Sequence, residues 1–265
     1  MPERAQLPIA LTIAGSDSGG GAGIQADLKT FASLGVHGVS AITCLTAQNP
    51  RKVLALQAAS TTIVRRQLEA VFAELPPKAV KTGMLYSAAI IAEVAKFLEG
   101  QPQLPLVVDP VMVSTSGVRL LKPEAVRVLL GRLLPLATLV TPNLEEAQVL
   151  VGSPLESVED LRQAARVLYQ RLGCAALVKG GHLRGYREAV DIFYDGRDEL
   201  LLSAPFVRGV HTHGTGCTYS AAVTGHLARG LPLAQAVQRA KGYISQAIAR
   251  SHRVAGHFVL NTLRP

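Results

Sequence analysis

Short apolar runs alternate along this chain with longer amphipathic segments, and this alternation constrains the fold more than any other feature. It is typical of a parallel α/β sheet, because each helix carries the chain back to the start of the next strand. We expect strands at residues 9–14, 39–43, 79–82, 106–109, 139–141 and 176–179. We expect helices between them at residues 22–34, 61–75, 87–98, 123–134 and 158–172.

Residues 188–207 interrupt the alternation with two short apolar runs around Asp195-Gly196. Such a turn predicts a β-hairpin, here a pair of antiparallel strands at the sheet edge. Two further helices are expected at residues 216–228 and 233–250. Because no repeat, low-complexity tract or linker interrupts the chain, we predict a single α/β domain over residues 1–265.

The net charge of +8 raises the question of an anionic partner. Basic residues are scattered, aromatic residues make up only 5% and Trp is absent, which argues against nucleic-acid binding. No apolar run is long enough to span a membrane and the N-terminus lacks an apolar targeting region, so we expect a cytoplasmic protein. The spacing of the cysteines indicates neither disulfides nor zinc, and two of them read as core residues: Cys44 and Cys174.

A glycine-rich turn at residues 209–217 leads into a helix of small residues. The backbone amides of Gly214, Thr215, Gly216 and Cys217 can converge at the positive end of that helix and form an anion site. The positive electrostatic potential at this helix end predicts a lowered pKa for the Cys217 thiol. When the turn is taken alone, an ordinary glycine-rich helix start is the better explanation, so the anion site depends on the residues that accompany it.

A second glycine-rich turn follows the first expected strand, at residues 14–27. It fits a relaxed dinucleotide fingerprint, but the acidic residue needed about 20 positions later is missing, since Glu69 is the next after Asp27. The chain contains no Gly-Lys pair, which excludes a Walker A loop. Close approach to a small ligand and a tight structural turn remain as explanations.

Polar residues follow several expected strands at their carboxyl ends, where open α/β sheets bind ligands. Asp109, Asn143 with Glu146, and Lys179 each have an ordinary explanation: a turn, a helix capping pair and a surface lysine. Together with the amides after residue 213, they are what phosphoryl transfer needs. The carboxylates would hold Mg²⁺, and the lysine and amides would neutralise the moving phosphoryl group.

These motifs resemble, over nearly the whole chain, the hydroxymethylpyrimidine/phosphomethylpyrimidine kinases of the ribokinase-like superfamily. The resemblance rests on the glycine-rich residues 11–31 and on Thr46-Ala-Gln-Asn49, Lys81-Thr-Gly-Met-Leu85, Val108-Asp-Pro-Val-Met112, Thr141-Pro-Asn-Leu-Glu-Glu-Ala147, Val178-Lys-Gly-Gly-His182 and His211-Thr-His-Gly-Thr-Gly-Cys217. It implies a three-layer α/β/α fold, a mostly parallel sheet with antiparallel edge strands, a homodimer, and ATP- and Mg²⁺-dependent phosphorylation of an aminopyrimidine alcohol and then of its monophosphate in thiamine biosynthesis.

The resemblance also implies roles for individual residues. Positions that match the pyrimidine contacts of the family are Gly15, Asp27, Gln48, Met84 and Val111. Asp109 and Glu146 match positions near Mg²⁺, whereas Asn143, Lys179 and Thr215 match nucleotide contacts. Gly214 to Cys217 match the anion hole; where sugar kinases of the superfamily carry a catalytic Asp, this chain has Cys217, which we expect to matter most for the first phosphorylation.

Two other functions remain open. A pyridoxal or pyridoxine kinase would share the fold and chemistry, but Gln48 favours an aminopyrimidine because its amide both donates and accepts. A non-catalytic pyrimidine sensor or DNA-associated regulator has only the +8 charge in its support. His211 and His213 could bind a metal, but without a third nearby ligand they are expected to shape the loop or make a hydrogen bond.

Overall fold

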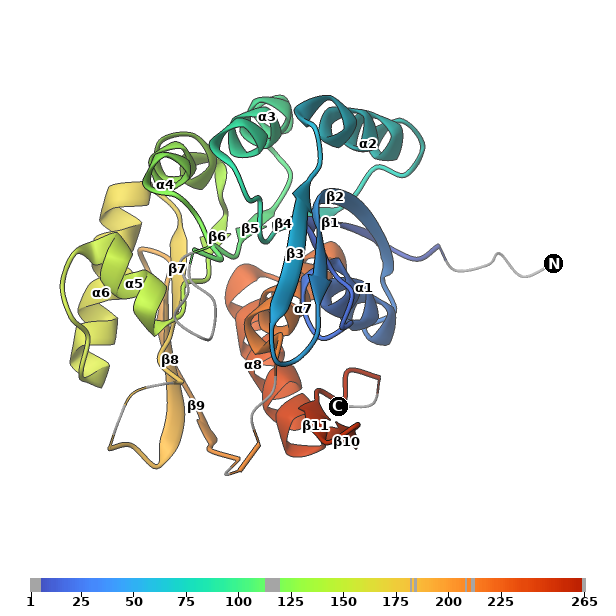
Figure 1. Ribbon diagram of the computed structural model, residues 1–265. Coiled ribbons are helices and arrows are strands. Elements are labelled where there is room, and N and C mark those ends of the chain that lie inside the picture. The colour runs from blue at the N-terminus through green and yellow to red at the C-terminus, as the bar shows by residue number, and fades with distance from the viewer. Residues whose placement is uncertain are drawn as a thin grey trace.

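The computed structural model describes residues 6–112, 120–181, 183, 185–207, 209–210 and 213–263. Nine strands of this described chain form one mixed sheet in the order β3-β2-β1-β4-β5-β6-β7-β8-β9 (Figure 1). In chain order the strands are β1 (Ile9–Asp17), β2 (His37–Gln48), β3 (Val53–Ala58), β4 (Ala79–Thr82), β5 (Leu106–Val108), β6 (Leu139–Val140), β7 (Ala175–Lys179), β8 (Glu188–Tyr194) and β9 (Glu199–Pro205).

Strands β2, β1, β4, β5, β6 and β7 pair in parallel, and the two edges of the sheet are antiparallel. The expected hairpin is confirmed as β8 and β9. Strand β3, which pairs with β2 at the other edge, was not predicted. Its residues are almost all exposed, so they lack the buried alternation by which a strand is recognised in a sequence.

Helices cover both faces of the sheet, which confirms the three-layer α/β/α fold (Figure 1). One face carries α1 (Gly23–Ser33), α7 (Thr215–Ala228) and α8 (Leu233–Ala249). The other carries α2 (Thr61–Glu74), α3 (Ala88–Leu98), α4 (Pro123–Val128), α5 (Leu144–Val151) and α6 (Val158–Leu172). The helix expected at residues 123–134 is α-helical only to Val128 and continues as a π-helical turn, η1 (Leu129–Leu133), and a 3₁₀ turn, η2 (Leu134–Leu136).

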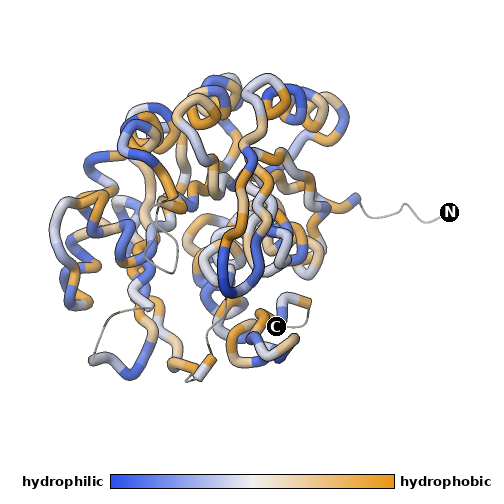
Figure 2. The backbone as a smooth tube through the Cα atoms, viewed as in Figure 1, coloured by the Kyte–Doolittle hydropathy of each residue, from blue (hydrophilic) through white to orange (hydrophobic). Residues whose placement is uncertain are grey.

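Alternate side chains of each strand enter opposite layers, as the period of two in a strand requires. In β1, Leu11 and Ile13 belong to the cluster beneath α2 to α6, whereas Ala10 belongs to the cluster beneath α7 and α8. The central strands are correspondingly apolar, and the helices alternate between hydrophobic and hydrophilic positions (Figure 2). Cys44 and Cys174 are buried and free, which confirms them as core residues.

A small hairpin, β10 (His252–Val254) with β11 (His257–Val259), follows α8. Among the described residues, none of the helices has the length and apolar character that crossing a bilayer requires.

Candidate active site

The carboxyl ends of the parallel strands lie along one edge of the sheet, and the N-terminus of α7 faces the same edge. Gly214 caps that helix with a left-handed backbone, φ 83°. A side chain at Gly214 would overlap the carbonyl oxygen of Gly21, so the two glycine-rich turns lie in direct contact. The turn at residue 214 therefore needs glycine both for its backbone angle and for this close approach.

Asp17, at the end of β1, organises the glycine-rich turn at residues 14–27. Its carboxylate accepts hydrogen bonds from the amides of Gly19, Gly21 and Ala22 at 2.8, 3.0 and 2.8 Å. Burial alone would raise the pKa of Asp17, but hydrogen bonds from His213 and from these amides lower it to about 2. The ionised carboxylate thus stabilises a turn that leads into α1 without a side-chain cap from Ala22.

Asp109 and Lys179, which follow β5 and end β7, meet at this edge as predicted. Lys179 Nζ lies 3.2 Å from Asp109 Oδ1, and a Cβ at Gly216 would lie 3.3 Å from the same Nζ. Burial lowers the pKa of Lys179, but the charges of Asp109 and Glu146 outweigh it and raise the pKa. The lysine is therefore a cation held beside the N-terminus of α7.

Ser220, one turn into α7, is a residue that sequence reasoning missed. Its hydroxyl lies 3.3 Å from Asp109 Oδ2 and 3.0 and 3.1 Å from the carbonyl oxygens of Gly216 and Cys217. It connects the helix carrying the anion loop to the carboxylate of the neighbouring strand. Nothing in the local sequence distinguishes it from any other small helical residue.

Glu146 and Asn143 form a complete capping box at the start of α5, which confirms the ordinary structural explanation for this pair. Glu146 also accepts the Met112 amide at 2.9 Å. Burial and the nearby charge of Asp109 raise the pKa of Glu146 to about 7, against the opposing effect of Lys179. A carboxylate whose proton affinity is raised by burial and by a second carboxylate also suits a divalent cation. The described residues nevertheless contain no group of three or more His, Cys, Asp or Glu side chains arranged to hold a metal.

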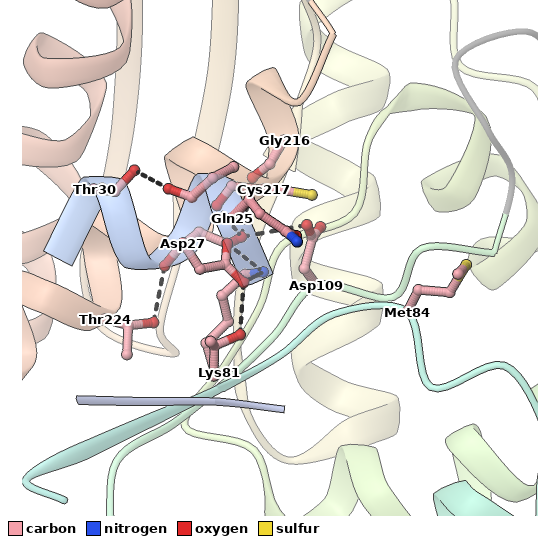
Figure 3. A network of polar contacts seen from close by, with 12 residues as sticks. Gln25, Asp27, Thr30, Lys81, Met84, Asp109, Gly216, Cys217 and Thr224 are labelled. Carbon is pink, nitrogen blue, oxygen red and sulfur yellow. Dashed lines mark hydrogen bonds and ion pairs between the residues drawn. The ribbon is translucent and has the colours of Figure 1, made fainter. Parts of the chain in front are cut away.

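Asp27 does not lie where a ligand could touch it, which corrects the expectation that it contacts the pyrimidine directly. Neither Asp27 nor Lys81 has any exposed surface, and Asp27 accepts hydrogen bonds from Lys81 and from Thr12 (Figure 3). Burial disfavours the Lys81 charge, but the Asp27 carboxylate outweighs it and raises the pKa of Lys81. Asp27 therefore belongs to a buried ion pair that lies beneath the site.

The prediction of a low pKa for Cys217 is wrong. Burial raises the pKa of the thiol to about 11; the carboxylates of Asp27 and Asp109 add to this, and Lys81 and the Gly23 amide only partly oppose them. Figure 3 shows Cys217 beside Gly216 and close to Asp109. At neutral pH the side chain is a protonated thiol in the structure as it stands.

The remaining pyrimidine candidates lie in or after four strands: Gly15 in β1, Gln48 in β2, Met84 after β4 and Val111 after β5. Met84 packs against Gly15, where a Cβ would come within 3.1 Å of its terminal methyl carbon. Val111 has a positive φ of 44°, an unusual backbone for a β-branched residue and a kind of strain that clusters at functional sites.

Gln48, at the end of β2, contacts His213, immediately before Gly214. This hydrogen bond confirms the expectation that His213 shapes the loop or makes a hydrogen bond. Two other histidines of the quoted motifs, His182 and His211, lie outside the described residues.

Fold and site together define a ribokinase-like kinase. The family model for phosphomethylpyrimidine kinase matches residues 17–261, and the chain belongs to this family. It is 51% identical over 249 residues to a hydroxymethylpyrimidine/phosphomethylpyrimidine kinase of Rhizobium meliloti, covering 93% of this chain and 92% of the relative.

Two solved structures share the fold. A phosphomethylpyrimidine kinase of Clostridium difficile superimposes with a TM-score of 0.81 at 44% identity, covering 92% of this chain and 100% of that chain. A pyridoxal kinase of Bacillus subtilis in complex with ADP superimposes with a TM-score of 0.89 at 39% identity, covering 96% of this chain and 97% of that chain. Fold similarity alone therefore does not distinguish a kinase that acts on phosphomethylpyrimidine from one that acts on pyridoxal.

Proposed function

We propose that this protein transfers the γ-phosphoryl group of ATP to hydroxymethylpyrimidine and then to phosphomethylpyrimidine, which yields the pyrimidine diphosphate used in thiamine biosynthesis. The observation that carries the proposal is the meeting of Asp109, Lys179 and the N-terminus of α7 at one edge of the sheet. A cation, a carboxylate and converging amides are the groups that phosphoryl transfer requires. The names of the relatives support the choice of substrate.

In this proposal, Lys179 and the amides of Gly214 to Cys217 neutralise charge on the transferring phosphoryl group. Asn143 and Thr215 lie at the starts of α5 and α7, where they would contact the nucleotide phosphates. Catalysis then comes mainly from positioning and charge stabilisation, since a loose transition state needs little covalent help. A protonated Cys217 fits this scheme, because no preformed base is required.

Asp109 and Glu146 are the residues that would hold Mg²⁺. When bound, the ion would neutralise negative charge on the phosphates. Two carboxylates are enough for an ion that keeps several waters and takes further ligands from its substrate. The raised pKa of Glu146 supports this assignment, because a bound cation would replace the proton that burial and Asp109 favour there.

The pyrimidine would lie between Gly15, Met84 and Val111, with Gln48 at its polar edge. An aminopyrimidine presents an N–H donor beside a ring nitrogen acceptor, and a glutamine amide complements both. Asp27 supports this pocket only through Lys81.

The substrate test measures phosphorylation of hydroxymethylpyrimidine, phosphomethylpyrimidine and pyridoxal separately, with products resolved by mass. We expect both pyrimidines to be better substrates than pyridoxal, and we expect Gln48→Ala to reduce kcat/KM for the pyrimidines by at least about tenfold. Turnover of pyridoxal alone would leave the phosphoryl-transfer site in place and overturn the pyrimidine assignment. Tight, salt-sensitive DNA binding without turnover would favour the regulator.

We further propose a homodimer in the cytoplasm. Three apolar side chains are at least half exposed on the edge hairpin of β2 and β3: Leu45 53%, Val53 52% and Leu54 65%. A cluster of this kind on an edge strand is a candidate contact surface. Light scattering after gel filtration measures the mass directly, and a monomer at all concentrations would contradict the dimer.

A further inference from the structure

Asp191 is a second buried carboxylate beside Lys179, and the proposed function does not use it. It lies on β8, directly opposite Lys179 of β7 in the antiparallel register. Opposite residues of an antiparallel pair project their side chains from the same face of the sheet, with Cβ atoms about 5 Å apart. Burial raises the pKa of Asp191, and the charges of Lys241 and Lys179 oppose this effect. Asp191 is thus close enough to attract the ammonium group of Lys179.

Lys241, on α8, pairs with Asp191 instead. Its Nζ lies 2.7 Å from Asp191 Oδ2 and donates to the carbonyl oxygen of Ala189 at 2.9 Å. The other carboxylate oxygen, Oδ1, accepts a hydrogen bond from the Gly180 amide at 3.1 Å. Both oxygens of Asp191 are therefore engaged by groups other than Lys179.

The Lys179 side chain is directed to a different carboxylate. Its Nζ lies 3.2 Å from Asp109 Oδ1, although β6 separates β7 from β5 in the sheet. Burial lowers the pKa of Lys179, and the charges of Asp109 and Glu146 raise it. Lys179 thus reaches a carboxylate two strands away, while the carboxylate on the adjacent strand is already paired.

We propose that Lys241 is a positioning residue that keeps Lys179 at the phosphoryl-transfer site by neutralising Asp191. The inference rests on the proposed function, in which Lys179 neutralises charge on the transferring phosphoryl group. Without Lys241, the Asp191 carboxylate would be buried with no cation, which is strongly unfavourable, and Lys179 is the cross-strand neighbour that can replace it. That new pair would draw Lys179 away from Asp109 and from the N-terminus of α7.

The experiment measures kcat and the KM values for ATP and hydroxymethylpyrimidine in Lys241→Met, after thermal unfolding verifies that each variant is folded. We expect kcat/KM for ATP to fall by at least about tenfold, because Lys179 leaves the phosphates, and KM for the pyrimidine to change by less than about twofold. Ile244→Ala is the matched control, since it destabilises the same helix through a buried cavity and removes no charge. It should leave kcat/KM for ATP within about twofold of wild type.

Adding Asp191→Asn to Lys241→Met removes the competing charge and keeps an acceptor for the Gly180 amide. This double variant should regain kcat/KM for ATP to within about threefold of wild type. In a Lys179→Met background, Lys241→Met should have no further effect, because Lys241 acts through Lys179. A loss that persists in the double variant, or the same further loss in the Lys179→Met background, would overturn the inference. Lys241→Gln provides the same comparisons without the charge if Lys241→Met does not fold.

Lys179→Met alone distinguishes failure of this inference from failure of the proposed function. If Lys179→Met leaves phosphorylation intact, the assignment of Lys179 fails and the role of Lys241 fails with it. If Lys179→Met impairs phosphorylation and Lys241→Met matches wild type, only the role of Lys241 fails.

Discussion

Lys81 Nζ lies 2.9 Å from Oδ1 and 2.8 Å from Oδ2 of Asp27, and neither side chain is exposed to solvent. The pair joins β4 to α1 directly beneath the N-terminus of α7 (Figure 3). Thr12 donates a third hydrogen bond to the carboxylate, but burial outweighs the effects of Lys81 and Thr12 and raises the pKa of Asp27. The charge of Lys81 also lowers the pKa of Cys217, so the pair affects the site that lies above it.

Lys81→Met should destabilise the protein strongly, because it leaves the Asp27 carboxylate buried without its cation. We expect the free energy of unfolding to fall by about 3–5 kcal/mol in urea denaturation. The control is Glu99→Gln, which breaks the exposed pair between Arg132 and Glu99 and should cost less than about 1 kcal/mol. Similar losses for the two variants would show that the buried pair has no special role.

Gly214→Ala should cost more than backbone strain alone. Gly214 and Gly230 share a φ of 83°, but only Gly214 has a neighbour, the Gly21 carbonyl oxygen, in the way of a side chain. Gly230→Ala therefore measures the strain, about 1 kcal/mol, and Gly214→Ala should cost about 3 kcal/mol in the same assay. Because the anion-loop amides would move, kcat should also fall by about a hundredfold in Gly214→Ala. Equal effects in the two variants would contradict the close packing of the two turns.

Ser220→Ala should weaken Mg²⁺ activation, because the single hydroxyl proton of Ser220 is shared between Asp109 Oδ2 at 3.3 Å and the nearer carbonyl oxygens of Gly216 and Cys217. We expect the Mg²⁺ concentration for half-maximal activity to rise by about tenfold. Thr224→Ala is the matched control, since the Thr224 hydroxyl bonds to the carbonyl oxygen of Ser220 one turn farther along and has no hydrogen bond to Asp109. An unchanged Mg²⁺ requirement in Ser220→Ala would remove Ser220 from the site.

The Cys217 thiol should react slowly with alkylating reagents near pH 7, because only the thiolate is nucleophilic and the pKa is about 11. The rate should rise steeply between about pH 9 and 11. Mass spectrometry of peptides labelled with iodoacetamide separates Cys217 from Cys44 and Cys174. Rapid, pH-independent labelling of Cys217 at pH 7 would restore the low pKa that the helix end suggested.

Cys217→Ala should reduce the two phosphorylations by similar factors. The expectation that Cys217 matters most for the first step required a thiolate that takes the proton of the hydroxymethyl group, and a thiol with a pKa of about 11 does not take it at neutral pH. Single-turnover rates for the two steps provide the comparison. A loss confined to the first step would contradict the protonated thiol and restore Cys217 as the base.

The sequence was sufficient for the fold because the buried strands and amphipathic helices each carry their own periodicity. Helix α6 and strand β4 begin and end at the predicted residues. The edge strand β3 escaped prediction because its exposed residues carry no burial pattern. The helix expected to end at residue 134 was too long as an α-helix because the five residues of the π-helical turn after Val128 are too few to reveal a different period in the sequence.

In the site, prediction succeeded where a residue follows a strand and failed where pairing depends on three-dimensional packing. Asp109 and Lys179 were expected at one edge because parallel strands end together. Asp27 and Lys81 are 54 positions apart, and nothing in either segment shows that each neutralises the other. The pKa of Cys217 was wrong for the same reason, since burial and two distant carboxylates outweigh the local helix end.

We propose that the edge formed by Asp109, Lys179 and the α7 N-terminus transfers phosphoryl groups to a pyrimidine. The most direct measurement is ³¹P NMR of one reaction containing the protein, Mg²⁺, ATP and hydroxymethylpyrimidine, with Asp109→Asn in parallel. We expect the pyrimidine monophosphate to form first and then its diphosphate, with both steps slowed at least about a hundredfold in Asp109→Asn. Hydrolysis of ATP without a phosphorylated pyrimidine, or equal rates in Asp109→Asn, would contradict it.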